Sequence, residues 1–253
     1  MVYYRKKNIL KMAEIWYNNE NVINKVDLLR YKFIQDKNDS AYFLENLFTI
    51  LIDLSMNEDE IFSLFKKNTK YEINRAINKD NIKCGILLDY GSDNIEKINE
   101  YINYYNDFAK SKKRSLIKID DIQQFINMKN ICIRYAKKDD EVLSMHAYVI
   151  SDNIVRLHQS CSLFRNSNDI EYKNMVARAN RLLHWDDILF FKQKGILLYD
   201  LGGWYGGKTN EEQLLINKFK ESFGGKIKQE YSYIIPVSIL GFISIFYRFI
   251  IKR

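Results

Sequence analysis

Apolar residues in the middle of the chain follow the pattern of β-strands. Three segments, 131–137, 142–150 and 153–161, are rich in β-forming residues and are separated by two short polar turns. Connections this short join neighbouring antiparallel strands. The sequence therefore predicts an antiparallel meander in this part of the chain.

Apolar residues at helical spacing precede the meander. Residues 61–77 predict two successive helical stretches, and residues 95–108 predict a further helix. Ser55 and Glu58 stand at the spacing of a capping box, in which each residue satisfies a free amide of the first helical turn. We therefore expect the first helical stretch to begin next to Ser55.

A helix, a strand, a second helix and a last strand are predicted after the meander. Asn168 and Glu171 cap a long helix that Gly195 ends. The segments that follow are a strand over 196–201, a helix capped by Thr209 and Glu212, and a strand over 227–235. This order of elements indicates a mixed α/β fold with helices packed on a central, largely antiparallel sheet.

The beginning of the chain predicts a β-hairpin. Residues 10–17 and 26–35 are rich in β-formers, and the polar segment Asn18 to Asn21 separates them. No proline-rich linker or internal repeat divides the chain. We therefore expect one domain over residues 1–235, with residues 1–47 as its N-terminal hairpin region.

The last segment, residues 236–253, is apolar and ends in basic residues. From Ile234 to Ile251 the only polar residues are Ser238, Ser244 and Arg248, and Lys252 and Arg253 follow. A bilayer span needs about 20 apolar residues, so this run is short for one. It predicts a helix that either packs on the domain or lies in a membrane interface.

Glycines mark the candidate site. Seven of the ten glycines fall between Gly195 and Gly225, and Gly202 and Gly203 directly follow the strand that ends at Asp200 and Leu201. Glycine lets the backbone take positive φ and approach a ligand without a Cβ in the way. The alternative is that these glycines only make tight turns.

Charge and composition narrow the classes of partner. The chain has a net charge of +7, which favours anionic partners such as a coenzyme, a tRNA, a lipid headgroup or a glycan precursor. The three cysteines are widely spaced, and no zinc motif, phosphate-binding loop or serine elbow occurs. We therefore expect no metal.

The charged start of the chain lacks the apolar stretch of a signal peptide, so we expect a cytoplasmic protein.

Several segments together resemble the GNAT acyltransferases, in particular the branch of the Fem aminoacyltransferases, which extend peptidoglycan bridges, and related acyltransferases of glycan biosynthesis. The likeness spans residues 48–234, about three quarters of the chain, and rests on segments 71–76, 179–185, 191–195, 199–203 and 219–225. It implies a GNAT-like central sheet flanked by helices and transfer of an acyl group to an amine.

Two departures from the family bear on the donor. Fem enzymes are built from two GNAT-like halves, whereas this chain has room for one half, a hairpin and helices. The chain also lacks the Arg/Gln-x-x-Gly-x-Gly loop that holds the pyrophosphate of coenzyme A, because the corresponding turn 163–169 has Arg165 and no glycine. The donor is therefore either an acyl-CoA, slightly favoured by chain length, or an aminoacyl-tRNA.

The resemblance assigns the pair Phe219 and Lys220 to the reacting acyl group. Lys220 would place positive charge near the oxyanion that forms during acyl transfer. The alternative is a solvated lysine beside a core phenylalanine. Gly202, Gly203 and Trp204 are further candidates for binding the substrate.

Three other residues are candidates by their chemistry. Asp200 can accept a proton or fix the amine, or it can cap the glycine turn through backbone amides. His184 on the long helix is a candidate base, or a satisfied core histidine, and the adjacent Trp185 is a candidate for binding the substrate. Arg75 is a candidate contact to an acceptor phosphate, with an exposed basic helix face as the alternative.

The function we expect is N-acylation of an amino sugar or peptide in cell-surface glycan assembly, at the inner face of the membrane. A lipid-linked or small-molecule glycan acceptor, a tRNA and the membrane surface are the partners this implies. The alternative of another class is a non-catalytic basic module that binds membrane.

His146 and His158 lie on adjacent predicted strands and could face a substrate.

Overall fold

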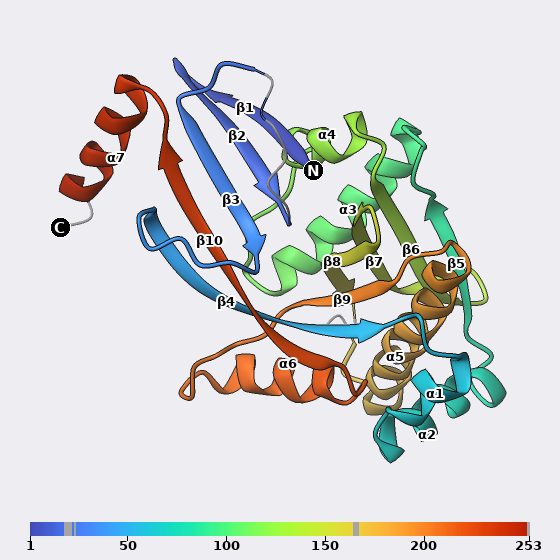
Figure 1. Cartoon of the computed structure of the whole chain (residues 1–253). Helices are drawn as coiled ribbons and strands as arrows, with labels where there is room; N and C mark the ends of the chain where they lie inside the picture. The colour runs from blue at the N-terminus through green and yellow to red at the C-terminus, as the bar shows by residue number, and fades with distance from the viewer. Residues whose placement is uncertain (18–21, 23, 164–166, 252–253) are drawn as a thin grey trace. The chain divides into compact units, whose positions relative to one another are not determined.

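The computed structural model describes residues 1–17, 22, 24–163 and 167–251 (Figure 1). The strands are β1 Val2–Lys7, β2 Leu10–Trp16, β3 Leu28–Ile34, β4 Tyr42–Asp53, β5 Lys83–Leu88, β6 Ile131–Lys138, β7 Glu141–Ser151, β8 Ile154–Ser162, β9 Leu198–Gly203 and β10 Lys226–Pro236. The helices are α1 Glu58–Ser63, α2 Lys67–Asn78, α3 Ile95–Ser111, α4 Ile119–Asn127, α5 Ile170–Gln193, α6 Glu211–Glu221 and α7 Ile239–Ile251.

The chain forms two compact units. The first unit comprises Met1–Thr49, Gly203–Leu214 and Ile227–Arg253, and the second comprises Ile50–Gly202 and Leu215–Lys226. Each unit combines helices with strands that pair mostly antiparallel, so the mixed α/β class expected from the sequence is confirmed.

The second unit is built on strands in the order β9-β8-β7-β6-β5. The pairs β5/β6, β6/β7 and β7/β8 are antiparallel, which confirms the predicted meander. β9 pairs in parallel with β8, so that Arg156 stands opposite Asp200. This parallel pairing brings two charged side chains to one place in the core.

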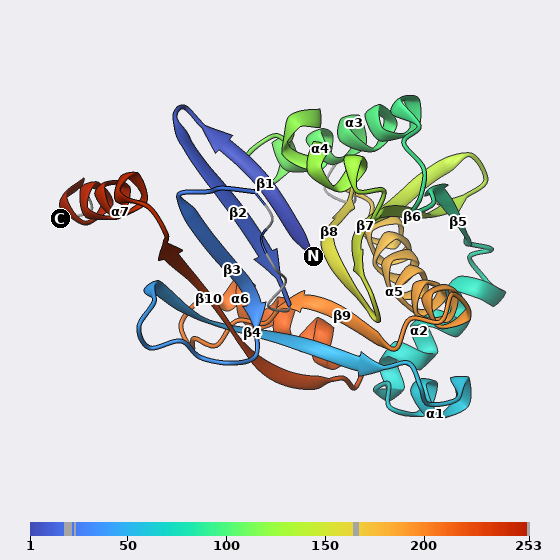
Figure 2. The ribbon, with the colours of Figure 1, turned by 45° about the horizontal axis from the view of Figure 1, so that its top comes forward.

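Helices cover both faces of this sheet (Figure 2). α5 packs across β5, β6, β7 and β8, while α3 contacts β5 and β8 and is followed by α4. Buried apolar residues such as Ala179 and Leu183 line the inner side of α5. The long helix is therefore held along its length by the sheet.

The first unit has the strand order β1-β2-β3-β10 and ends in α7. β1 and β2 form a tight antiparallel hairpin whose turn contains Asn8, at φ 54°. Within the described ranges, no helix combines the length and the apolar character that crossing a bilayer requires. The C-terminal segment is a helix that follows the last strand, as the sequence predicts.

The predicted hairpin of residues 10–17 and 26–35 is wrong. β2 pairs in parallel with β3, with Met12 opposite Leu28, and its antiparallel partner is β1. The sequence reasoning passed over β1 because its Tyr and Lys residues carry no apolar run. Its predicted turn at 18–21 lies outside the described residues, as does Arg165 of the turn 163–169.

Helix starts differ from the predicted caps by one or two residues. α1 begins with a capping box of Asn57 and Glu60, because the Ser55 hydroxyl donates to Asp53 instead. Asp169 caps α5 by accepting a hydrogen bond from the Glu171 amide at 2.8 Å. The helices that the sequence predicts are present, and α4 is a further helix that it did not predict.

The end of α6 is fixed in the core of the second unit. Phe223 is fully buried against Phe65 and His184, with ring centroids 5.2 Å and 5.0 Å away. Gly224, at φ +75°, then lets the chain pass the backbone of Leu64. These contacts determine where the last turn of α6 places its side chains.

We predict that Gly224→Ala destabilises the protein by about 3 kcal/mol. A Cβ there would lie 2.6 Å from the Leu64 Cβ and closer still to its carbonyl oxygen, which adds an overpacking cost of about 2 kcal/mol to a left-handed backbone cost of about 1 kcal/mol. Urea unfolding measures the loss.

The matched control is Gly195→Ala. Gly195 has φ +81° and nothing within 4 Å of the Cβ position, so only the backbone cost of about 1 kcal/mol applies. Equal losses in the two variants would show that the Leu64 contact does not constrain the end of α6.

Candidate functional site

The bend after β9 is held by one carboxylate. Asp200 is completely buried, and its Oδ1 accepts a hydrogen bond from the Gly202 amide at 2.7 Å. Gly202 has φ +74°, and a Cβ on it would lie 3.0 Å from the Leu157 carbonyl oxygen. The bend therefore requires glycine at this position, and Asp200 stabilises it as an aspartate-capped turn.

Arg156 of β8 neutralises Asp200. The Arg156 guanidinium, itself buried, forms an ion pair with Oδ2 of Asp200. A buried carboxylate is stable only when it is paired and hydrogen-bonded, and here both conditions are met on the two oxygens. The pair makes the bend rigid and places a fixed negative charge beneath it.

Lys220 stands beside this bend. It lies in the last turn of α6, is half-buried, and its Nζ is 3.8 Å from the position that a Cβ of Gly202 would take. Burial, together with the charge of Arg156 and against the attraction of Asp200, lowers the pKa of the Lys220 ammonium to about 8. An amine with this pKa exchanges protons near neutral pH.

His184 belongs to a chain of buried hydrogen bonds. Its Nδ1 lies 2.8 Å from the Tyr199 hydroxyl, which lies 2.6 Å from the Tyr148 hydroxyl. Tyr148 in turn donates to Oδ2 of Asp187 at 2.5 Å. The chain runs from α5 through β9 and β7 and returns to α5.

The direction of these bonds fixes the tautomer of His184. Each tyrosine hydroxyl has one proton, and the Asp187 carboxylate can only accept. Tyr148 donates to Asp187, so Tyr199 donates to Tyr148 and the Nδ1–H of His184 donates to Tyr199. Burial, with the nearby charges of His146 and Lys220, holds the pKa of His184 well below its ordinary value. The ring is therefore neutral, with its lone pair on Nε2.

Asp187 is the anchor of the network. Its Oδ1 accepts from Nε of Arg134 at 2.6 Å, and its Oδ2 lies 2.7 Å from Nδ1 of His146. Nε2 of His146 lies 2.8 Å from Asn180, so this buried histidine faces α5. The Arg134 guanidinium also pairs with Asp186, one residue earlier on α5.

Phe219 brings an aromatic ring next to His184. The centroids of the Phe219 and His184 rings lie 5.6 Å apart. The guanidinium of Arg181 lies 5.1 Å from the centroid of the Phe219 ring. Trp185 packs against Phe62 and against Phe65. Of these predicted residues, Phe219 lies with His184 and Lys220, whereas Trp185 packs on α1.

Arg75 lies on a different part of the second unit. It is on α2, and its guanidinium pairs with Glu171 of α5 at 2.9 Å. Arg178 joins the same carboxylate and also pairs with Asp80, which ties α2 to α5. A phosphate at Arg75 would have to compete with Glu171.

Gly203 and Trp204 belong to the first unit. Gly203 is exposed, with open space around its Cβ position. The Trp204 amide donates to the Phe48 carbonyl at 2.7 Å, and the two rings meet edge to face at 5.9 Å. Their part in binding a substrate stays a prediction.

Sequence reasoning missed the partners of the site. Arg156 and Arg134 each stand inside an apolar strand segment, and Asp187 lies four residues after Leu183 on the buried side of α5. Charged residues at core positions are the signal that could have found them, because an unpaired buried charge is costly. His158, in contrast, is exposed, with its ring 5.1 Å from Phe125 of α4.

No cluster of three or more histidine, cysteine or acidic side chains suited to a metal ion occurs among the residues that the structure describes. The ionisable groups placed near the bend are the Lys220 amine of lowered pKa, the neutral imidazole of His184 and the Asp200 carboxylate, which is bound by Arg156.

The chain is similar in fold to several solved structures, and three of them follow. FemX is 10% identical, with a TM-score of 0.64 over 92% of this chain and 84% of that chain. The C-terminal domain of a putative lysylphosphatidylglycerol synthetase from Agrobacterium fabrum is 10% identical, with a TM-score of 0.58 over 97% and 83%. The L-PGS of Bacillus licheniformis is 10% identical, with a TM-score of 0.56 over 98% and 84%.

No family model and no curated protein sequence matches the chain. At this level of identity the likeness concerns the fold. It shows that this chain shares the fold of FemX and of the two lysylphosphatidylglycerol synthetase structures, as expected from the resemblance to the Fem enzymes.

We predict that Asp187→Ala destabilises the protein by about 4 kcal/mol. The change removes the buried acceptor of the Arg134 Nε and of the Tyr148 hydroxyl, and breaking one partner of a buried pair costs about 3–5 kcal/mol. The midpoint of urea unfolding measures the loss.

The neighbouring Asp186→Ala is the control. Asp186 pairs with the same guanidinium, but its side chain is 42% exposed, so its loss costs about 1 kcal/mol or less. If both variants lost the same stability, the network would not be anchored at Asp187.

Proposed function

We propose that this protein is an N-acyltransferase that uses Lys220, beside the glycine bend, to stabilise the reacting acyl group. The observation that carries the proposal is the position of the Lys220 ammonium next to Gly202, together with its lowered pKa. The fold shared with FemX supports it. The resemblance to the Fem family is what assigns Phe219 and Lys220 to the reacting acyl group.

The reaction needs no covalent enzyme intermediate. The nitrogen of a neutral amine attacks the carbonyl carbon of an activated ester or thioester, and the carbonyl electron pair moves to oxygen. The C–N bond forms, the C–O or C–S bond then breaks with its electron pair on the leaving group, and the amine loses a proton. The enzyme has to align two substrates and stabilise the oxyanion.

Lys220 can serve both the oxyanion and the leaving group. With a pKa of about 8 its side chain is about nine-tenths protonated at pH 7, so it offers positive charge to the oxyanion. The same pKa makes it a better proton donor to the leaving group than an ordinary lysine. The proton taken from the amine can later restore the ammonium.

Asp200 and His184 support Lys220 in this proposal. Asp200 has both oxygens engaged by Arg156 and the Gly202 amide, so it acts as a positioning residue for the bend. His184 is 1% exposed and packs against Phe219, so it supports the helix that bears Lys220. Phe219 and Gly202 are proposed to contact the substrates beside Lys220. Substrate binding by Gly203 and Trp204 of the first unit, and by Trp185 and Arg75 of the second unit, stays a prediction.

The donor is an acyl-CoA or an aminoacyl-tRNA, and the acceptor is the amino group of a sugar or peptide. Both donors are anionic and agree with the net charge of +7. Cell-surface glycan assembly at the inner face of the membrane is the setting in which such acceptors occur. A small-molecule or lipid-linked glycan is the acceptor class we propose.

We predict acyl transfer to amino-sugar nucleotides and short peptidoglycan peptides from one of the two donor classes. Each donor, radiolabelled on its acyl group, is incubated with the protein and the acceptors, and labelled amide is counted with and without RNase. Loss of product with RNase identifies the tRNA donor. Lys220→Ala lowers the rate about 100-fold, as loss of one oxyanion donor does.

Lys218→Ala is the matched control, because Lys218 is an exposed lysine on the same helix. It keeps the full rate. A folded Lys220→Ala protein with the full rate would remove Lys220 from the reaction. If neither donor class gave labelled product with any of the acceptors, the non-catalytic membrane-binding module would be favoured instead.

A further inference from the structure

The C-terminal helix α7 shows an apolar stripe to solvent. Five of its side chains are between 53% and 81% exposed, namely Ile239, Phe242, Ile243, Phe246 and Tyr247. Their spacing of three and four residues places them on one face of the helix. An exposed apolar surface of this kind marks an interaction site.

The opposite face of α7 is already docked on the first unit. Gly241 lies directly against the backbone of Asp27, where no side chain would fit. Ile245 is 3% exposed and packs with Leu28 and Ile234. The Ser238 hydroxyl donates to Oδ1 of Asp27 at 2.6 Å and fixes the start of the helix. The helix is therefore held with its apolar stripe outward.

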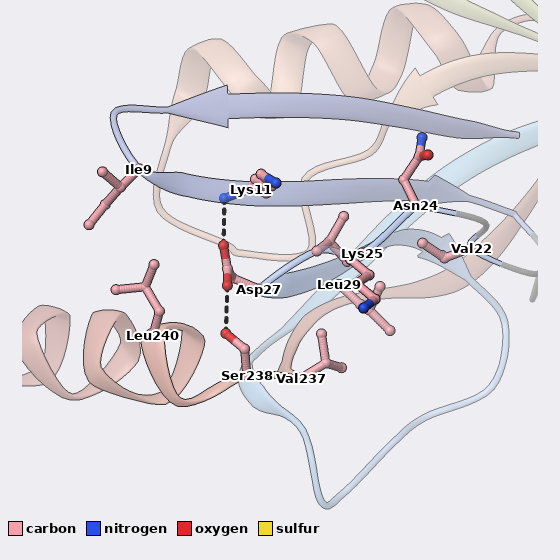
Figure 3. Close-up of a pocket in the computed structure, with 11 residues that line it drawn as sticks. Ile9, Lys11, Val22, Asn24, Lys25, Asp27, Leu29, Val237, Ser238 and Leu240 are labelled. Carbon is pink, nitrogen blue, oxygen red and sulfur yellow. Dashed lines mark hydrogen bonds between the residues drawn. The ribbon is translucent and has the colours of Figure 1, made fainter.

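A basic hollow adjoins the start of this helix (Figure 3). It has a volume of about 760 Å³, and its lining includes Lys11 and Lys25 from one side and Leu240 from α7. Ile9, at the tip of the β1–β2 hairpin and 71% exposed, lies at its edge. Apolar and cationic groups thus occur together here.

The cations outnumber the acid in this region. Asp27 also lines the hollow, but its carboxylate accepts hydrogen bonds from the Lys11 amide and from Ser238. A neighbouring hollow of about 400 Å³ shares Lys11 and Lys25 and adds Arg5 and Lys6. The surface next to α7 is therefore suited to anions.

A third hollow lies along α7 itself. It has a volume of about 360 Å³ and is lined by Tyr42, Phe242, Ile243, Ile245 and Phe246. Its walls are apolar apart from the tyrosine hydroxyl. It is suited to a hydrocarbon chain rather than to a polar ligand.

We propose that this face of the first unit binds the surface of an anionic phospholipid bilayer. The apolar stripe of α7 and Ile9 lie among the acyl chains near the headgroups, and Lys11, Lys25, Arg5 and Lys6 meet lipid phosphates. Apolar burial and attraction to anionic lipid act together in such interfacial helices. Each lysine near an anionic leaflet strengthens binding by about fivefold.

Charge argues against a second copy of the chain as the occupant. Two copies meeting through α7 would bring the cations of both hollows together, in a protein whose net charge is +7. Like charges at an interface oppose association. An anionic bilayer instead neutralises them and covers the apolar stripe at the same time.

The test is sedimentation of the full-length protein with lipid vesicles. We expect binding to mixed phosphatidylcholine and phosphatidylglycerol vesicles, and much weaker binding to phosphatidylcholine alone. Phe242→Ser with Phe246→Ser, and separately Lys11→Glu with Lys25→Glu, each weaken binding by at least about tenfold. The four side chains lie at the surface, so we expect the variants to fold, which circular dichroism checks.

Matched controls carry the same changes in the second unit. Ile77→Ser with Ile170→Ser removes two exposed apolar side chains, and Lys79→Glu with Lys83→Glu reverses two exposed lysines. Both control proteins keep full binding. The assay requires no turnover, so its result is independent of the proposed acyl transfer.

Three outcomes would overturn the proposal. They are no binding to anionic vesicles, equal binding to neutral and anionic vesicles, and equal weakening by the control variants. A second copy of the chain would be the occupant if the protein does not sediment with vesicles and forms dimers in light scattering. The double variant Phe242→Ser with Phe246→Ser would then have to abolish those dimers.

Discussion

The buried ion pair of Arg156 and Asp200 is the interaction on which the candidate site depends. It joins two parallel strands, and the Oδ1 atom of Asp200 accepts a hydrogen bond from the Gly202 amide at the glycine bend. Because both oxygens are engaged, the bend has one stable conformation. Lys220 lies next to this hydrogen-bonded backbone, and a charge held in place in advance is what stabilising a transient oxyanion requires.

Behind the bend, the polar chain from His184 to Asp187 serves the same purpose. It is satisfied at every step between α5, β9 and β7, so it fixes the helix against the sheet without leaving a free charge. A neutral His184 in this chain also spares Lys220 a second positive neighbour. The two networks explain why so many ionisable groups can lie in one core.

The meander and the long helix could be predicted from the periodic spacing of apolar residues. The strand, bend and helix around Gly202 could be predicted from that spacing together with the position of the glycines, because both signals depend only on nearby residues. The parallel pairs were not predictable, since the pairing of β2 with β3 and of β8 with β9 depends on the order of strands in space. Asp200 could be named from sequence because it directly precedes the glycine bend. Its partner Arg156 could not, because the two residues meet only through the pairing of β8 with β9. Lys220 could be named through the Fem resemblance, but its burial required the structure.

The central claim is that Lys220 is an amine of lowered pKa beside the bend, and it can be measured directly. Acylation of the folded protein with a small anhydride over a range of pH, read by peptide mass spectrometry, gives the midpoint for each lysine. The account predicts a midpoint near pH 8 for Lys220. A midpoint near 10.4, the ordinary value for lysine, would contradict it.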